Sequence, residues 1–125
     1  MGAAGGGALK FTVNGRLTVD GICTANGLNG ATGGGAGGSV WLTVGELAGA
    51  GVICANGGTA YGGGGGGGRL AIYFTTNSFA GTVTAYGRGA AGGAGTIYWK
   101  AASASAGTVW LDNAGAAGNY TPLDA

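Results

Sequence analysis

Hydrophobic and polar residues alternate along several short segments of this chain, and these segments recur every 26 to 31 residues. Alternation with a period of two residues is typical of β-strands that bury one face. The first strand of each repeat is predicted to begin near Leu9, Val40, Leu70 and Ile97. A second, shorter strand is predicted to follow Gly21, Gly51, Gly81 and Gly107. The pattern therefore predicts four equivalent units, each with two strands and a glycine-rich return segment.

The alternation also assigns the faces of the strands. The inward columns of the first strands are predicted to be Leu9, Val40, Leu70 and Ile97, then Phe11, Leu42, Ile72 and Trp99, then Val13, Val44, Phe74 and Ala101. The inward columns of the second strands are predicted to be Cys23, Ile53, Val83 and Val109, then Ala25, Ala55, Ala85 and Leu111. Because such columns recur at a fixed period, equivalent strands should stack in parallel, each rung contacting only its neighbours.

Parallel strands need crossovers, which are right-handed in nearly all proteins. The sequence therefore predicts an all-β fold, a right-handed parallel β-solenoid of about four rungs. The rungs are placed at about residues 8–38, 39–68, 69–95 and 96–125 of a single repeat domain that covers residues 1–125.

The longest glycine-rich segment is the run of seven glycines at residues 62–68. Glycine runs can be flexible linkers, because glycine has the most backbone freedom to lose on ordering. Shorter glycine-rich segments stand at the same place in the other units, however, so the run belongs to the repeat. Without Cβ atoms, such segments can pack closely, as glycine does at the collagen axis. We expect them to form one side of the solenoid in a polyproline-II-like path; a loose surface loop is the alternative.

Composition narrows the function classes. Of the 125 residues 34 are glycine, but 46% are hydrophobic and only 7% are charged, unlike typical disordered chains. Five scattered Lys and Arg residues and a net charge of +1 argue against nucleic-acid binding, which needs a basic stripe. No segment is apolar enough for a membrane span. So little charge favours a secreted or cell-surface protein.

Few residues could support catalysis or metal binding. The chain has no histidine, the commonest general base and a common metal ligand. Its acids are Asp20, Glu46, Asp112 and Asp124. Asp20 and Glu46 are placed in the inter-strand turns of adjacent rungs, where solvated turn residues are expected. No catalytic, metal or cofactor site is predicted.

The two cysteines, Cys23 and Cys54, are predicted to remain unpaired. The repeat places Cys23 opposite Ile53 and Thr24 opposite Cys54, so the two thiols point to opposite faces of neighbouring strands. A disulfide needs Cβ atoms about 3.8 Å apart. One thiol should be buried, which is the inward Cys23, and the other should lie near the surface.

Outward-facing residues supply the candidate interaction surface, which consists of Trp41, Tyr73, Tyr98, Lys100 and Trp110. A row of aromatic rings on a flat sheet can stack on sugar rings, as in a carbohydrate-binding module. The alternative is that another subunit or another part of a longer protein covers the rings, and the apolar outward residues Ile22, Val52 and Cys54 favour it. Outward threonines raise a third interpretation, an ice-binding face, but bulky side chains interrupt their columns.

The phrases GGGAGGSVWLTV, GGGGGGGRLAIYF, GTVTAYG and GGAGTIYWK resemble glycine-rich repeats of large secreted bacterial proteins, the adhesin or filamentous-haemagglutinin-like β-helix proteins. The resemblance covers nearly the whole chain. It implies a secreted or cell-surface setting and provides no catalytic residues.

The predicted function is that of a non-enzymatic extracellular structural protein, either a self-assembling filament subunit or an adhesin-type solenoid segment. No capping segment is apparent at either end, so copies are expected to stack head to tail. One alternative is a carbohydrate-binding module whose outward aromatics contact surface glycans. A second alternative is a polysaccharide-active β-helix enzyme.

Overall fold

The computed structural model describes residues 1–121, and that part of the chain is built from β-strands without a helix. The longer strands are β1 (Ala8–Thr18), β3 (Ser39–Ala48), β5 (Arg69–Asn77) and β7 (Thr96–Ala101). The shorter strands are β2 (Ile22–Thr24), β4 (Val52–Cys54), β6 (Thr82–Thr84) and β8 (Thr108–Trp110). Residues 1–121 accordingly contain no helix that could cross a membrane.

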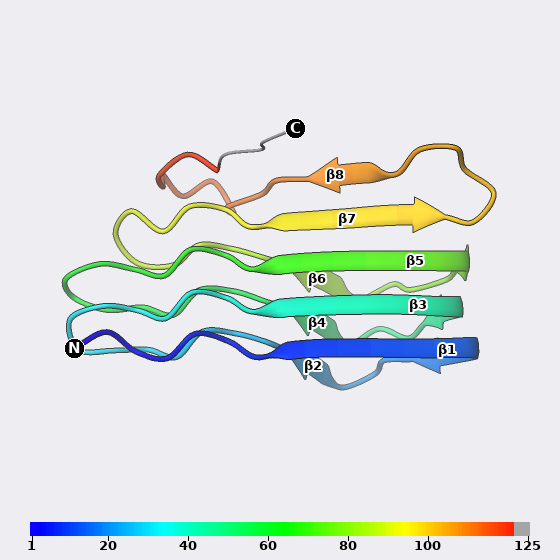
Figure 1. Cartoon of the computed structure of the whole chain (residues 1–125), viewed down its shortest axis with the longest axis horizontal. Helices are drawn as coiled ribbons and strands as arrows, with labels where there is room; N and C mark the ends of the chain where they lie inside the picture. Colours follow the sequence, from blue (N-terminus) through cyan, green and yellow to red (C-terminus); the bar gives the residue numbers. More distant parts are fainter. Residues whose placement is uncertain (122–125) are drawn as a thin grey trace.

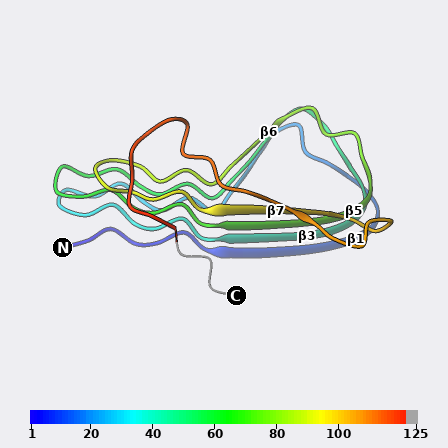
Figure 2. The same ribbon diagram turned by 90° about the horizontal axis from the view of Figure 1, so that it is seen from above.

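The strands stack as a parallel β-solenoid. β1, β3, β5 and β7 pair in parallel in that order, and β2, β4 and β6 form a second parallel sheet. The sheet that contains β1, β3, β5 and β7 faces the viewer in Figure 1 and is called the front sheet. The chain runs along it, returns behind it and rises by one strand per turn, which is a right-handed path (Figure 1). Seen from above, the turns superpose, and the glycine-rich segments lie beyond one end of the sheets (Figure 2). The predicted fold class is confirmed.

The register of the front sheet is the one that the alternation predicted. Leu9 pairs with Val40, Val40 with Leu70, and Leu70 with Ile97, so the first inward column is continuous. The largest fully buried side chains come from the middle turns: Leu42, Leu47, Ile53, Leu70, Ile72 and Val40. Full burial of such a side chain stabilises a fold by about 1.5–3 kcal/mol. The core therefore lies between the two sheets.

The glycine-rich segments form a packed third side. Gly34 donates its N–H to the carbonyl oxygen of Gly63 in the next turn at 2.8 Å, and Gly37 donates likewise to Gly66. Gly35, which lies between these donors, donates within its own turn instead. Donors three residues apart thus have equivalent partners, and three residues per turn is the period of polyproline II. The expectation of a packed side is confirmed, and the alternative of a loose loop is wrong.

Glycine is needed here for close approach of backbones. In the run of residues 62–68, a Cβ would find room at Gly63 and Gly66, where nothing lies closer than 3.7 Å. At Gly64 or Gly67, a Cβ would overlap a backbone carbonyl of the adjacent segment. No glycine of this run has a positive φ angle, so left-handed backbone conformation is not the reason for glycine.

Asparagine side chains connect successive turns beside the glycine segments. The backbone N–H of Asn56 donates to Oδ1 of Asn26, and the N–H of Tyr86 donates to Oδ1 of Asn56, both at 2.7 Å. Thr59 donates its N–H to Oδ1 of Asn29 at 2.8 Å. In each pair the partners are 30 residues apart, so these hydrogen bonds hold equivalent positions in register.

The number of residues per turn of the solenoid changes at two places. Val13 pairs with Val44 but Arg16 pairs with Glu46, so a one-residue β-bulge in β1 accounts for the longer first unit. The number of residues from the start of β5 to the start of β6 equals the number from the start of β3 to the start of β4. The shorter third unit therefore loses its three residues between β6 and β7, within the glycine-rich segments.

The fourth repeat differs from the prediction. β8 turns back and pairs antiparallel with β7, instead of continuing the second sheet above β6. β7 has only 6 residues, compared with 9 to 11 in the earlier first strands. A tight turn follows it, in which Ala104 donates its N–H to the carbonyl oxygen of Ala101. The chain therefore reverses early, and the solenoid has about three turns rather than four.

This reversal also exchanges the predicted faces of β8. Trp110 pairs with Ile97, so Trp110 lies on the inner face. Val109 pairs with Tyr98 and lies on the outer face, where it is half-exposed. The predicted inward position of Val109 and the predicted outward position of Trp110 are both wrong, because β8 joins the sheet of β7, in a register that sets Trp110 beside the inward Ile97. Leu111, also predicted to point inward, is exposed.

The two ends of the stack differ. At the N-terminal end, within the described chain, β1 and β2 have no partner on their outer edges. At the C-terminal end, β8 covers the edge of β7, and the following segment crosses the glycine-rich side (Figure 1). There Asn119 donates its N–H to the carbonyl oxygen of Ala91, and Thr121 donates its hydroxyl to that of Ala94. The C-terminal end is therefore partly covered, although within the described chain β6 and β8 have no partner on their outer edges.

Candidate interaction surface

Three aromatic side chains form a row on the outer face of the five-stranded sheet. They are Trp41 on β3, Tyr73 on β5 and Tyr98 on β7. Trp41 and Tyr98 stand in one column with Ala71, whereas Tyr73 stands in the next column, so their contacts are diagonal. The ring centroids are 6.1 Å apart for Trp41 and Tyr73 and 5.7 Å apart for Tyr73 and Tyr98. Lys10 extends the row to β1, with Nζ 4.6 Å from the Trp41 ring centroid.

The rings are tilted against one another. The interplanar angle is 38° for Trp41 and Tyr73 and 63° for Tyr73 and Tyr98. Tilted and edge-to-face contacts between neighbouring strands stabilise a sheet by packing ring against ring. The geometry therefore favours a packing role, and carbohydrate binding stays a prediction.

Lys100 lies on the same face but is held by the turn after β7. Its Nζ donates to the carbonyl oxygen of Ala104 at 2.6 Å. The Tyr98 ring lies against Gly107 before β8, where a Cβ would overlap the ring. Both side chains thus support the reversal of the chain. The structure brings together four of the five predicted surface residues, and Trp110 is the exception.

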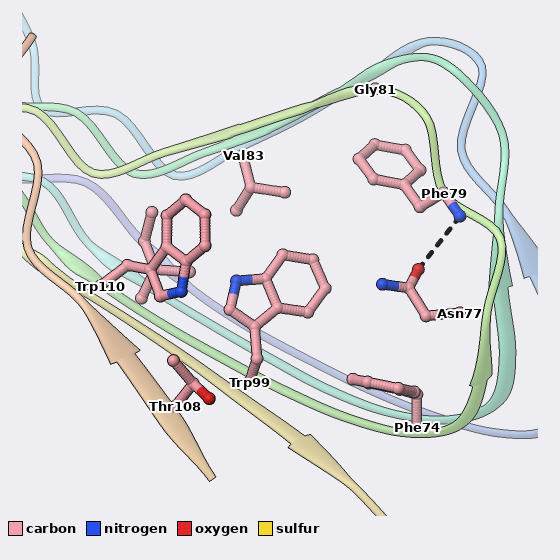
Figure 3. Close-up of a pocket in the computed structure, with 9 residues that line it drawn as sticks. Phe74, Asn77, Phe79, Gly81, Val83, Trp99, Thr108 and Trp110 are labelled. Carbon is pink, nitrogen blue, oxygen red and sulfur yellow. Dashed lines mark hydrogen bonds between the residues drawn. The ribbon is translucent and has the colours of Figure 1, made fainter.

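Trp110 lines a pocket at the C-terminal end of the solenoid core. The pocket holds about 500 Å³, because no second-sheet strand lies above β6. In Figure 3, Trp110 and Trp99 stand side by side, while Val83 approaches from β6 and Phe79 from the turn between β5 and β6. Phe74 lines the pocket from β5 and packs edge-to-face on Trp99 at 6.2 Å between centroids.

The acidic residues of the described chain take part in contacts between or within turns. Glu46 lies in β3, not in a turn as predicted, since β3 is longer than expected. Its carboxylate accepts hydrogen bonds from Nε of Arg16 and Oγ of Ser78, both at 2.8 Å. Asp20 lies in a turn as expected, and its Oδ1 accepts the N–H of Ala50 at 3.1 Å. Within residues 1–121, no group of three His, Cys, Asp or Glu side chains could hold a metal ion. Asp124 lies outside the described residues.

The contacts of Glu46 predict a pH-dependent contribution to stability. The hydrogen bond from Ser78 and then that from Arg16 hold the pKa of Glu46 below its ordinary value of 4.5. A carboxyl whose pKa is lower in the folded state stabilises the fold above its unfolded pKa and loses this effect as the pH falls through the folded value. We therefore expect Glu46→Gln to lower the thermal midpoint at pH 7, and expect the difference to vanish well below pH 4.5.

Thermal unfolding followed by circular dichroism at several pH values measures this difference. The effect should be small, because Arg16 is largely exposed and exposed ion pairs contribute little. Asp20→Asn serves as the control. A Glu46→Gln difference that stayed constant down to acid pH would contradict the assignment.

Cys23 and Cys54 are free cysteines on opposite faces of the second sheet, as predicted from the register. Their burial is the reverse of the expectation. Cys54 is buried on the middle strand, whereas Cys23 is only partly buried because its strand lies at the N-terminal end of the stack. Burial, and secondarily the proximity of Cys54, raises the pKa of the Cys23 thiol.

Comparisons with protein-family models, with curated proteins and with solved structures give no match. The structure thus defines the class of the protein, a parallel β-solenoid of about three turns. The resemblance to secreted adhesin-like β-helix proteins stays a prediction.

Sequence reasoning missed one group of polar residues, the asparagines beside the glycine segments. Asn26, Asn29 and Asn56 were not among the predicted surface residues. The signal was the spacing of three residues in the phrase ANGLNG, which matches the polyproline II period.

Proposed function

We propose that this chain is a non-enzymatic structural solenoid that works outside the cell or at its surface, and that copies of it associate through their N-terminal ends. The extracellular setting is supported by the low charge and by the glycine-rich repeats that resemble secreted proteins. The association rests on one observation, the difference between the two ends of the stack.

The N-terminal end exposes part of the core. Phe11 is 42% exposed, whereas Leu42 and Ile72, which follow it in the same inward column, are 1% and 0% exposed. Open strand edges are templates for pairing with another chain. The free edges of β1 and β2 therefore supply backbone donors and acceptors beside an apolar surface.

The extent of the two sheets at each end of the stack favours one form of association. At the N-terminal end, β1 and β2 belong to the same turn, so their edges are level. At the C-terminal end, β7 and β8 extend the front sheet two strands beyond the second sheet. The outermost strands at the C-terminal end, β8 and β6, therefore lie at different positions along the stack, and an N-terminal end cannot pair with both of them at once. Two N-terminal ends can instead pair β1 with β1 and β2 with β2 of the second copy. Such a contact closes as a dimer, while head-to-tail stacking would propagate as a filament.

Phe11→Asp is expected to weaken association by more than about tenfold, because an interface would bury an unpaired carboxylate. In the isolated chain this position is half-exposed, so the variant should still fold. Sedimentation velocity across a concentration series measures the association, and circular dichroism checks the fold.

Trp110→Asp is the matched control at the other end, where the side chain is 60% exposed. A dimer formed by two N-terminal ends should not respond to this substitution. A head-to-tail filament should be weakened by both variants. A wild-type chain that stays monomeric at high concentration would refute association in either form.

A further inference from the structure

The asparagines beside the glycine segments present their amide nitrogens in a fixed direction. A backbone N–H can only donate, so the side-chain atom that faces it must be the amide oxygen. The N–H groups of Asn56, Tyr86 and Thr59 in this way fix Oδ1 of Asn26, Asn56 and Asn29, respectively. Among residues 1–121, none of the three Nδ2 groups has an acceptor in the protein.

These three asparagines line one groove of about 310 Å³. Asn26 and Asn29 lie three residues apart and therefore on the same side of a polyproline-II-like segment. Asn56 stands above Asn26 and is only 7% exposed. No side-chain nitrogen or oxygen of the described chain is both buried and without a partner, so the Nδ2 group of Asn56 is open to the solvent of the groove. Gly27, Gly57 and Thr59 complete the lining together with Arg88 from the third turn.

Arg88 adds a positive charge to this groove. Its guanidinium lies 5.8 Å from the Tyr86 ring centroid, a contact that orients the side chain over the third turn. Every lining residue is neutral except Arg88, so no carboxylate of the described chain competes for these donors at the groove. The volume is at the lower end of the range for small-molecule sites, about 300–1,000 Å³.

Asn113 shows how a purely structural asparagine differs. Its Oδ1 accepts the N–H of Gly87, while its Nδ2 donates to the carbonyl oxygens of Gly92 and Ala116. All of its hydrogen-bonding groups thus have partners within the protein. The asparagines of the groove use only their oxygen atoms in this way, and their nitrogen atoms remain for a ligand.

We propose that this groove binds an oxyanion, a carboxylate or sulfate group, through the amide nitrogens of Asn26, Asn29 and Asn56 and the guanidinium of Arg88. Hydrogen bonds from such donors to a charged acceptor are stronger than those between neutral groups. The groove exceeds the size of a single oxyanion, so an acidic sugar that carries one of these groups would also fit. Binding should weaken with rising salt, because the site is open to solvent.

Titration by nuclear magnetic resonance tests the proposal, with sodium sulfate and digalacturonate as probes and sodium chloride added to hold the ionic strength constant. The side-chain amide signals of the three asparagines should shift saturably. Tighter binding of digalacturonate than of sulfate would show that the sugar contributes, and equal binding would show that the oxyanion suffices. Absence of a saturable shift with both probes would overturn the proposal.

Variants with matched charge changes make the test specific. Arg88→Gln and Asn56→Asp should each weaken binding by about tenfold or more. Asp keeps the oxygen that accepts the backbone N–H and replaces only the donor. Asn29→Asp repeats the test at an exposed position, where folding is not at risk. Arg69→Gln and Asn14→Asp change the charge equally outside the groove. Equal weakening by these controls would mean general attraction and would refute the site.

Discussion

Gly67→Ala is expected to destabilise the fold by about 3 kcal/mol or more, although it adds a single methyl group. The new Cβ would overlap the carbonyl oxygen of Ala85 and lie 2.5 Å from the backbone nitrogen of Gly95. Neither atom is the end of a flexible side chain, so whole backbone segments would have to separate. That separation would also strain the hydrogen bond from Gly67 to Gly93.

Gly66→Ala is the matched control, one residue away in the same run. Its Cβ would meet no atom closer than the carbonyl oxygen of Gly93 at 3.7 Å. Ala36 already occupies the equivalent position in the preceding turn. Replacing glycine where alanine fits can even stabilise a protein by about 0.4–1 kcal/mol, because the unfolded chain loses freedom. Chemical denaturation of both variants would measure the contrast, and equal stability would contradict the packed side.

Ile72→Asp is expected to prevent folding. Ile72 is 0% exposed in the middle of the core, and burying an unpaired carboxylate costs several kcal/mol. Its neighbour Ala71 points to the outer face, between Trp41 and Tyr98. Ala71→Asp should therefore cost only about 1 kcal/mol, a typical value for a point substitution.

Circular dichroism and two-dimensional nuclear magnetic resonance spectra of the two aspartate variants decide this prediction. The substitutions introduce the same charge on adjacent residues of one strand and differ only in the face to which they point. Identical melting curves for both variants would contradict the assigned faces of β5.

The core could be predicted because a one-residue slip would turn every side chain of a strand to the wrong face. Leu42 and Ile72 recur at the same phase of the alternation, and a parallel stack is the arrangement that buries both. The reversal at β8 could not be predicted in this way. Its phrase GTVWLDN has the same alternation as GTVTAYG, and alternation specifies that a strand has a buried face without specifying its partner.

For the candidate surface, the sequence could predict the face of most residues but not the orientation of their rings. The alternation placed Trp41, Tyr73 and Tyr98 on one outer face, and the structure brings them into contact. The tilt of their rings depends on side-chain torsions, which no sequence pattern reports. Trp110 was misplaced because its face follows from the antiparallel pairing of β8.

The three-residue period of the glycine side governs how this kind of solenoid can change in length. The third unit is three residues shorter than the second, and the difference lies within the glycine-rich segments. Removing three residues removes one full turn of a polyproline II helix, so the same faces still meet the neighbouring backbones. Removing one residue would rotate the rest of the segment by a third of a turn and bring the wrong positions into the crowded contacts. We therefore expect insertions and deletions here to occur in triplets of residues, whereas the first unit accommodates its single extra residue in the β-bulge of β1.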